Sequence, residues 1–196
     1  MTFLTAFADL GLVLPFAGII TFALLAVGRR RDAVAWSIGV AGTLATMLLL
    51  KLAVFVALGP EAQGALRNPS GHTASGTVVY AGLFVLLGGR LAPRVLMALV
   101  VGLGFCIVFG ATRLALHVHT LADVLVGAAV GLAGTLALAC MASPCRVKKP
   151  DRDTLLVTMA ALLSLLALHG QTLHAEGEIA SIADQIRSAS RATCHR

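Results

Sequence analysis

The chain has 196 residues, of which 58% are hydrophobic and only 12% are charged, and its formal net charge is +6. Soluble globular domains contain about 45–50% apolar and about 25% charged residues, so this composition excludes an ordinary soluble domain. It also excludes a disordered chain, because disorder requires low hydrophobicity and high charge. The apolar residues stand in long blocks between short charged clusters, the pattern of a polytopic membrane protein.

Six apolar blocks predict an all-α bundle of six transmembrane helices, since a span needs roughly 20 residues and the length allows about six spans. We expect a membrane-embedded domain at residues 1–169 and a polar C-terminal tail at residues 170–196. The last block is the shortest, and the side of the membrane on which the tail lies depends on whether this block spans. The blocks are residues 10–27, 33–58, 72–88, 95–111, 120–141 and 154–169.

The basic residues lie mainly after the first, third and fifth blocks, and this placement predicts the topology. By the positive-inside rule these loops face the cytoplasm, whereas the N-terminus, the 59–71 and 112–119 loops and the tail face outward. The positive charge therefore reflects topology, and we do not expect a nucleic-acid partner. The basic residues are Arg29, Arg30, Arg31, Arg90, Arg94, Arg146, Lys148, Lys149 and Arg152.

Asn68-Pro69-Ser70-Gly71-His72 opens the third block and is the first group of polar residues at an outward helix end. Pro and Gly interrupt the incoming chain, and Ser is a preferred helix cap. A helix that starts here directs unpaired backbone N–H groups outward, which suits an anion, and Ser70 adds a hydroxyl donor. The alternative is a capped helix start with a histidine placed there by chance.

Arg113-x5-His119-x3-Asp123 leads into the fifth block. His119 and Asp123 are four residues apart, so on a helix they share a face and can touch. A carboxylate on one imidazole nitrogen makes the other nitrogen a better nucleophile or base. Arg113 offers a planar fork for phosphate or carboxylate oxygens. The alternative is a structural His–Asp pair at a helix N-terminus, where Asp is favoured.

Lys51 lies inside the second block, about 10 Å from its outward end at 1.5 Å per residue. Alone it is compatible with a lysine that extends to the membrane interface. Together with Arg67 and Arg113, however, it places three cations near two histidines and an aspartate. Phosphoryl transfer requires this combination: donors for the oxygens, a nucleophile and an acid for the leaving group.

These residues resemble the type 2 phosphatidic acid phosphatases, membrane relatives of the vanadium haloperoxidases. The family pattern is Lys-x6-Arg-Pro, then Pro-Ser-Gly-His, then Ser-Arg-x5-His-x3-Asp. The second element is complete at residues 69–72, and the third has Thr112 in place of Ser. The first element retains Lys51, but Leu58 and Gly59 stand where Arg and Pro are expected.

The resemblance implies a six-helix fold, no metal or other cofactor, and a role for each matching residue. His119 would attack phosphorus and become a phosphohistidine, oriented by Asp123, and His72 would protonate the leaving oxygen. The phosphoryl oxygens would be held by Lys51, Ser70, the Gly71 N–H and Arg113. We add the hypothesis that Arg67 supplies the charge missing at position 58, because it is the other cation of the outward loop between these blocks. His117 receives no role.

The predicted function is hydrolysis of a lipid phosphate or diphosphate at the outer face of a membrane, such as a bacterial cytoplasmic membrane. Phosphatidic acid, phosphatidylglycerol phosphate and undecaprenyl diphosphate are the leading substrates, and lipid A phosphate is a further candidate. Three alternatives remain: a metal protein using His72, His117, His119 and Asp123, an anion or lipid transporter, and a degenerate family member that only binds lipid. The chain gives no indication of oligomeric state.

Two further segments have structural interpretations. Gly127, Gly131 and Gly134 form a stripe of small residues that we interpret as a helix-packing face. In the tail, Ile179, Ile182 and Ile186 have a spacing that permits a weak amphipathic helix on the membrane surface, and a frayed tail is the alternative.

Overall fold

The structure is a computed structural model that describes residues 2–59, 66–88, 93–143, 152–173 and 175–194. Every regular element in these ranges is helical, which confirms the all-α class for this part of the chain. The elements are α1 (Thr2–Ala6), α2 (Leu10–Ala26), α3 (Arg30–Leu58), α4 (Gly71–Gly76), the π-helical η1 (Thr77–Ala81), α5 (Gly82–Gly88), α6 (Arg94–Ala115), α7 (Leu121–Met141), α8 (Arg152–Leu168) and α9 (Ala175–Cys194).

Each of the six apolar blocks coincides with a helix or, for the third block, with the continuous α4–η1–α5 segment. Four of these are long and apolar enough to cross a membrane: Arg30–Leu58, Gly71–Gly88, Arg94–Ala115 and Leu121–Met141. The helix α2 is apolar but has only 17 residues, and α8 also has 17. The structure thus supports a membrane protein with at least four candidate spans, and the count of six stays a prediction.

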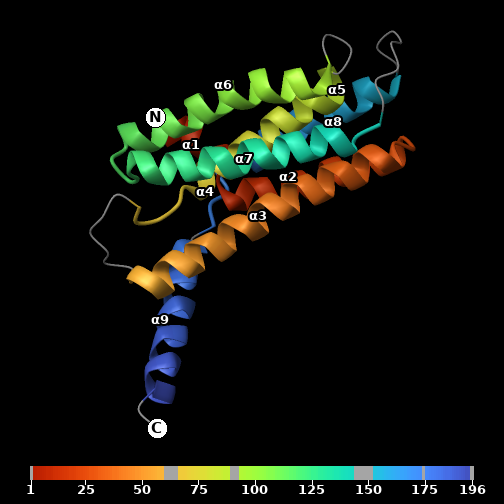
Figure 1. Ribbon diagram of the computed structural model, residues 1–196. Coiled ribbons are helices and arrows are strands. Elements are labelled where there is room, and N and C mark those ends of the chain that lie inside the picture. The colour runs from red at the N-terminus through yellow and green to blue at the C-terminus, as the bar shows by residue number, and fades with distance from the viewer. Residues whose placement is uncertain (1, 60–65, 89–92, 144–151, 174, 195–196) are drawn as a thin grey trace.

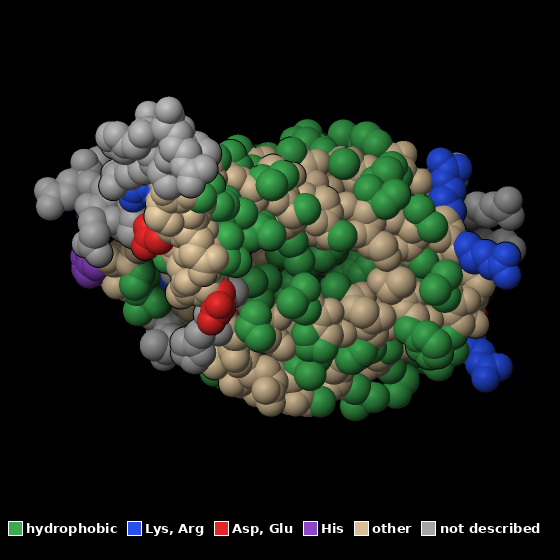
Figure 2. Space-filling model, turned by 90° about the horizontal axis from the view of Figure 1, so that it is seen from below, with side chains coloured by type: hydrophobic (Ala, Val, Ile, Leu, Met, Phe, Trp, Pro, Cys, Tyr) green, Lys and Arg blue, Asp and Glu red, His purple; other side chains and the backbone are tan. Residues whose placement is uncertain are grey.

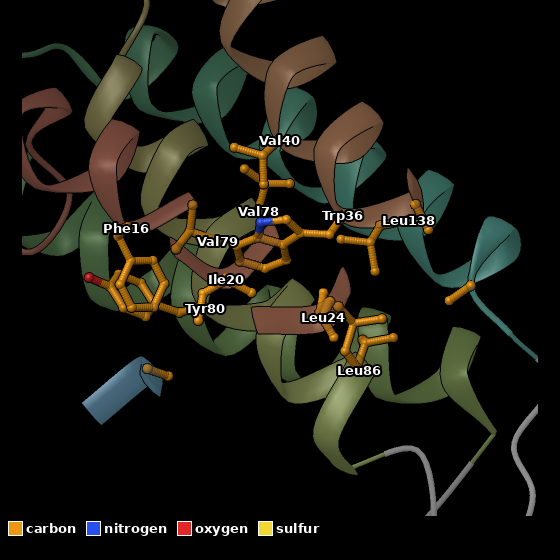
Figure 3. Packing of buried hydrophobic residues seen from close by; sticks show 14 of the residues in the cluster. Phe16, Ile20, Leu24, Trp36, Val40, Val78, Val79, Tyr80, Leu86 and Leu138 are labelled. Atoms are coloured by element: carbon orange, nitrogen blue, oxygen red, sulfur yellow. The ribbon is translucent and has the colours of Figure 1, made fainter. Parts of the chain in front are cut away.

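The α4–η1–α5 segment lies at the centre of the bundle (Figure 1). Its apolar window is 72% buried, compared with 28–39% for the other long candidate spans. Trp36 of α3 is fully buried beside Val78 and Val79 of this segment, and its indole N–H donates to the Ala17 carbonyl of α2 at 3.1 Å (Figure 3). The outer helices instead carry many exposed Leu, Ile and Val side chains, as expected for helices in contact with lipid.

The glycine stripe of α7 is a packing face, as predicted. A Cβ at Gly127 would overlap the Ser70 carbonyl oxygen, and a Cβ at Gly131 would lie 2.8 Å from the Ala74 carbonyl oxygen. Gly134 faces α3, where a Cβ would overlap the Thr43 hydroxyl. The stripe therefore lets α7 approach both the start of the central segment and the middle of α3.

The start of α3, the start of α6 and the end of α7 lie at one end of the bundle (Figure 1), where Lys and Arg side chains gather (Figure 2). Asp32 organises this end: its carboxylate is 2.8 Å from the Arg29 guanidinium and 3.8 Å from that of Arg94, and it accepts a 2.7 Å hydrogen bond from the Ser143 N–H. The residues Arg90, Arg146, Lys148 and Lys149 lie outside the described ranges.

The tail forms the helix α9 at the opposite end of the bundle, so the helical interpretation of this segment is confirmed. This helix runs crosswise to the long helices and adjoins the end of α3 (Figure 1). Ala183 is fully buried, and Arg187 lies against Gly59, whereas Ile182 and Ile186 remain 46% and 43% exposed.

Candidate active site

Asp123 is the residue that joins the predicted motifs at this second end of the bundle. It lies in the first turn of α7 with its side chain 1% exposed. One carboxylate oxygen accepts hydrogen bonds from the backbone N–H groups of Arg67 and Asn68, both at 2.9 Å, and the other accepts from the Thr120 N–H at 3.0 Å. The Asp123 carbonyl oxygen also accepts from the Ser70 N–H at 3.0 Å.

The contacts between Asp123 and Thr120 follow from local sequence. Thr120 is the N-cap of α7, and its hydroxyl accepts from the Asp123 N–H at 3.2 Å while the Asp123 carboxylate binds the Thr120 N–H, a complete capping box. The pattern Thr-x-x-Asp is readable from sequence. The long-range bonds to residues 67 and 68 are not, because they depend on how the 66–70 segment folds against α7.

His119 lies in the turn before α7, not on the first turn of the helix, which corrects the prediction that His119 and Asp123 share a helix face. Thr120 caps the N-terminus of α7, so the helix begins at Leu121 and does not include His119. The structure still brings the two side chains together, with Nδ1 of His119 3.9 Å from a carboxylate oxygen of Asp123. This separation is within ion-pair range but too long for a hydrogen bond. The His119 side chain is only 1% exposed.

Ser70 caps α4, as its position predicted. Its backbone is extended at φ −73° and ψ 99°, and its hydroxyl accepts from the Thr73 N–H at 3.3 Å and lies 2.9 Å from the Thr73 hydroxyl. Ser70 is fully buried, and Gly71 and His72 follow as the first residues of the helix. The α4–η1–α5 helix therefore begins at the proposed anion site, in direct contact with Asp123 and Gly127 of α7.

Lys51 is directed towards this helix start and is 5% exposed, so it does not extend to the surface. Its Nζ donates a 2.7 Å hydrogen bond to the Asn68 side-chain oxygen. Its Cε would be 3.5 Å from a Cβ at Gly71, so the side chain runs along that glycine. The ammonium group therefore lies beside the start of the helix.

Arg113 lies in the last turn of α6, which continues through Ala115 and shortens the loop predicted at 112–119. Ala, Arg and Leu all favour helix, so nothing in this segment stops α6 at residue 111. Arg113 is 9% exposed, and the Thr112 hydroxyl donates to the Phe109 carbonyl within the helix. His117 is exposed and left-handed, with φ +55°, in the turn between α6 and α7.

Arg67 differs from the other predicted residues because it is exposed. Its backbone N–H binds Asp123, so the segment is anchored while the side chain extends outward. Within the described ranges, which include all four ligands of the metal alternative, no three His, Cys, Asp or Glu side chains form a metal-binding group.

Two contacts of the site residues were not predicted. Asn68 receives the Lys51 hydrogen bond, and Asp9, the N-cap of α2, lies 3.7 Å from Nε2 of His72. A capping aspartate before an apolar block is a recognisable signal. Its proximity to His72 is a tertiary contact between residues 63 positions apart in the sequence, and no local pattern indicates it.

Comparison with known families agrees with the motifs. Residues 59–146 match the family described as PAP2 superfamily. Over these residues the match supports the type 2 phosphatidic acid phosphatase superfamily. The matched region runs from the end of α3 past the end of α7 and contains His72, Arg113, His119 and Asp123. No curated protein and no solved structure matches the chain. This similarity, together with the long apolar helices, supports a membrane protein of the phosphatase type.

Proposed function

We propose that this PAP2 protein is a metal-independent phosphatase that hydrolyses a lipid phosphate or diphosphate through a phosphohistidine. The observation that carries the proposal is the pairing of buried His119 with Asp123 directly beside the Ser70 helix start and the buried cation Lys51. A nucleophile, an anion-binding helix start and a cation thereby share one end of an apolar bundle.

Each residue has a step in the reaction. His119 attacks phosphorus through Nε2, because Nδ1 faces Asp123, so a P–N bond forms while the P–O bond to the leaving group breaks. His72 gives its proton to the departing oxygen. Water then attacks the phosphohistidine and returns a proton to His72, the P–N bond breaks, and inorganic phosphate leaves.

The phosphoryl oxygens are held by groups at the start of α4 and on its neighbours. Lys51, Arg113, the Ser70 hydroxyl and the Gly71 N–H supply positive charge and donors where negative charge develops. Both cations are buried, and an ion pair with phosphate is stronger in such surroundings than in water.

The substrate is most simply a phosphorylated lipid headgroup. The site lies at the end of helices whose sides are apolar and exposed, so a headgroup can reach it while the acyl or isoprenyl chains stay in the bilayer. Phosphatidic acid, phosphatidylglycerol phosphate and undecaprenyl diphosphate fit this description, and lipid A phosphate is a further candidate. We propose that the site faces the outside of a bacterial cytoplasmic membrane.

The test is phosphate release by the purified protein in detergent with EDTA present, over a panel of these lipids. We expect release in the wild type and about a 10³-fold or greater loss in His119→Ala, because the nucleophile is removed. His117→Asn is the matched control, since Asn tolerates the left-handed backbone of this exposed histidine, and it should retain activity. Release that EDTA abolishes, or that survives in His119→Ala, would contradict the mechanism.

Arg67 provides a separate prediction, because we propose that its exposed guanidinium replaces the charge missing at Leu58. Arg67→Ala should lower kcat/KM about 10-fold or more, the cost of one charge-assisted contact to phosphate. The control is Arg30→Ala, an exposed arginine at the other end of the bundle. Unchanged turnover in Arg67→Ala would eliminate this role.

A binding-only protein is the second candidate, and the departure at Leu58 and Gly59 is the observation that favours it. A folded wild-type protein that releases no phosphate from any lipid of the panel, but binds one of them, would support this candidate.

A further inference from the structure

Asp9 presents a carboxylate to His72 from outside the region that matches the PAP2 superfamily. Asp9 is the N-cap of α2, and one of its oxygens, Oδ1, accepts hydrogen bonds from the Gly11 N–H at 2.9 Å and the Leu173 N–H at 2.7 Å. The other oxygen, Oδ2, lies 3.7 Å from Nε2 of His72. One oxygen thus holds the side chain in place, and the second faces the imidazole.

The segment that carries Asp9 is attached to the same helix as His72. The Ser75 hydroxyl donates to the Ala8 carbonyl at 2.9 Å, and the Tyr80 hydroxyl donates to the Phe7 carbonyl at 2.6 Å. Ser75 and Ala8 are each 1% exposed. These two contacts beside the pair hold the backbone of Asp9 against the helix of His72, whereas two flexible side chains at the surface would not hold their separation.

The capping role alone does not require a carboxylate at this position. Asn caps helices about as well as Asp, and a cap uses only one side-chain oxygen. The charge of Asp9 has a second consequence, because a carboxylate at ion-pair distance stabilises the protonated imidazole of His72.

We propose that Asp9 is a positioning residue for His72: its carboxylate orients the imidazole and stabilises its proton-bearing form, so that His72 can protonate the leaving oxygen. This inference rests on the proposed phosphatase function. The separation of 3.7 Å is longer than a hydrogen bond, and catalytic contacts of this kind tighten when substrate binds.

The test compares two kinds of phosphate ester in the full-length protein. A lipid phosphate has a poor leaving group that requires protonation, whereas 4-nitrophenyl phosphate releases a phenolate that does not. Asp9→Asn keeps the cap and the Leu173 contact but removes the charge. We expect kcat/KM for the best lipid of the panel to fall about 10- to 100-fold, within the contribution of general acid catalysis. For 4-nitrophenyl phosphate kcat/KM should change less than about twofold, because kcat/KM reports only the steps up to departure of the leaving group and not the later hydrolysis of the phosphohistidine.

Two further variants complete the experiment. Asp153→Asn removes an acidic residue from the first turn of α8 at the other end of the bundle and should behave as wild type. In a double-mutant cycle, Asp9→Asn added to His72→Ala should lower lipid turnover no further, because Asp9 acts through His72. If the wild type does not turn over 4-nitrophenyl phosphate, the double-mutant cycle on lipid turnover alone tests the role of Asp9.

The outcomes separate the two proposals. Equal losses on both esters, additive losses in the cycle, or unchanged lipid turnover in Asp9→Asn would overturn the role of Asp9 while the phosphatase function stands. A folded wild type that releases no phosphate from any ester would overturn the phosphatase function, and the role of Asp9 with it.

Discussion

The Asp123 carboxylate accepts hydrogen bonds from the backbone and also lies within ion-pair distance of His119. It receives hydrogen bonds from three backbone N–H groups, two of them from the 66–70 segment, and its distance to Nδ1 of His119 is 3.9 Å. The residue expected only to orient a histidine therefore also fixes the segment that ends in Ser70. Its loss should affect both stability and catalysis.

Asp123→Asn tests this double role. The amide oxygen can still accept from Arg67 and Asn68, but the amide nitrogen then meets the Thr120 N–H, so one buried donor loses its acceptor. We expect a loss of about 1–3 kcal/mol in the free energy of unfolding, measured by thermal or denaturant unfolding in detergent. Phosphate release should fall as well. Unchanged stability with reduced turnover would restrict Asp123 to the catalytic role.

Glycines decide the distance between elements, and α7 is the clearest case. Gly127 lies where any side chain would overlap the Ser70 carbonyl oxygen, so the helix that carries Asp123 and the helix that starts at Ser70 can be in contact. The same stripe continues through Gly131 and Gly134. The geometry of the site thus depends on residues that have no functional group.

Gly127→Ala should destabilise the protein by about 1–3 kcal/mol, the usual cost of overpacking, and should reduce turnover because Ser70 is displaced. Gly104→Ala in α6 is the matched control, since a Cβ there meets nothing within 4 Å. It should be neutral or slightly stabilising, because Ala favours helix by about 1 kcal/mol over Gly. Equal effects of the two substitutions would show that close packing at Gly127 is unimportant.

The helix α9 is expected to lie in the membrane interface. It runs crosswise to the long helices, its Ala183 is buried, and Ile182 and Ile186 are left exposed on the apolar face (Figure 1). An amphipathic helix of this kind buries such side chains among lipid headgroups and the first acyl carbons.

A tryptophan placed on either face of α9 tests this orientation. In proteoliposomes with brominated lipid, fluorescence of Ile182→Trp should be quenched more strongly than that of Ser188→Trp on the opposite face. The native Trp36 is fully buried and present in both variants, so the wild type supplies the background. Equal quenching would argue against an interfacial position.

Charged residues of the described chain lie at the two ends of the bundle, the ion pairs of Asp32 at one end and the site residues at the other. Arg29, Asp32 and Arg94 form ion pairs at one end of the bundle, while Lys51, Arg113 and the two site histidines lie at the other. The positive-inside rule predicts that the Asp32 end faces the cytoplasm, so the site faces outward.

Cysteine labelling tests this orientation in intact cells. In a background without native cysteines, we expect His117→Cys to react with a membrane-impermeant maleimide added outside. Arg30→Cys should react only after the cells are permeabilised. Both positions are exposed in the fold, so a difference reflects the membrane and not burial. The reverse pattern would place the site in the cytoplasm.

The sequence determined the features that depend on composition and local chemistry. Apolar blocks located the helices to within a few residues, Ser70 was recognisable as a cap, and the spacing of small residues indicated the packing face of α7. Such signals are local because helix formation, capping and glycine packing follow from the types of neighbouring residues.

Only the tertiary structure decided which groups meet. It turned Lys51 inward to Asn68, placed His119 before the helix, joined Asp123 to the 66–70 backbone and brought Asp9 to His72. These contacts join residues on different helices, and their distances depend on how closely the helices pack, which no spacing within one segment encodes.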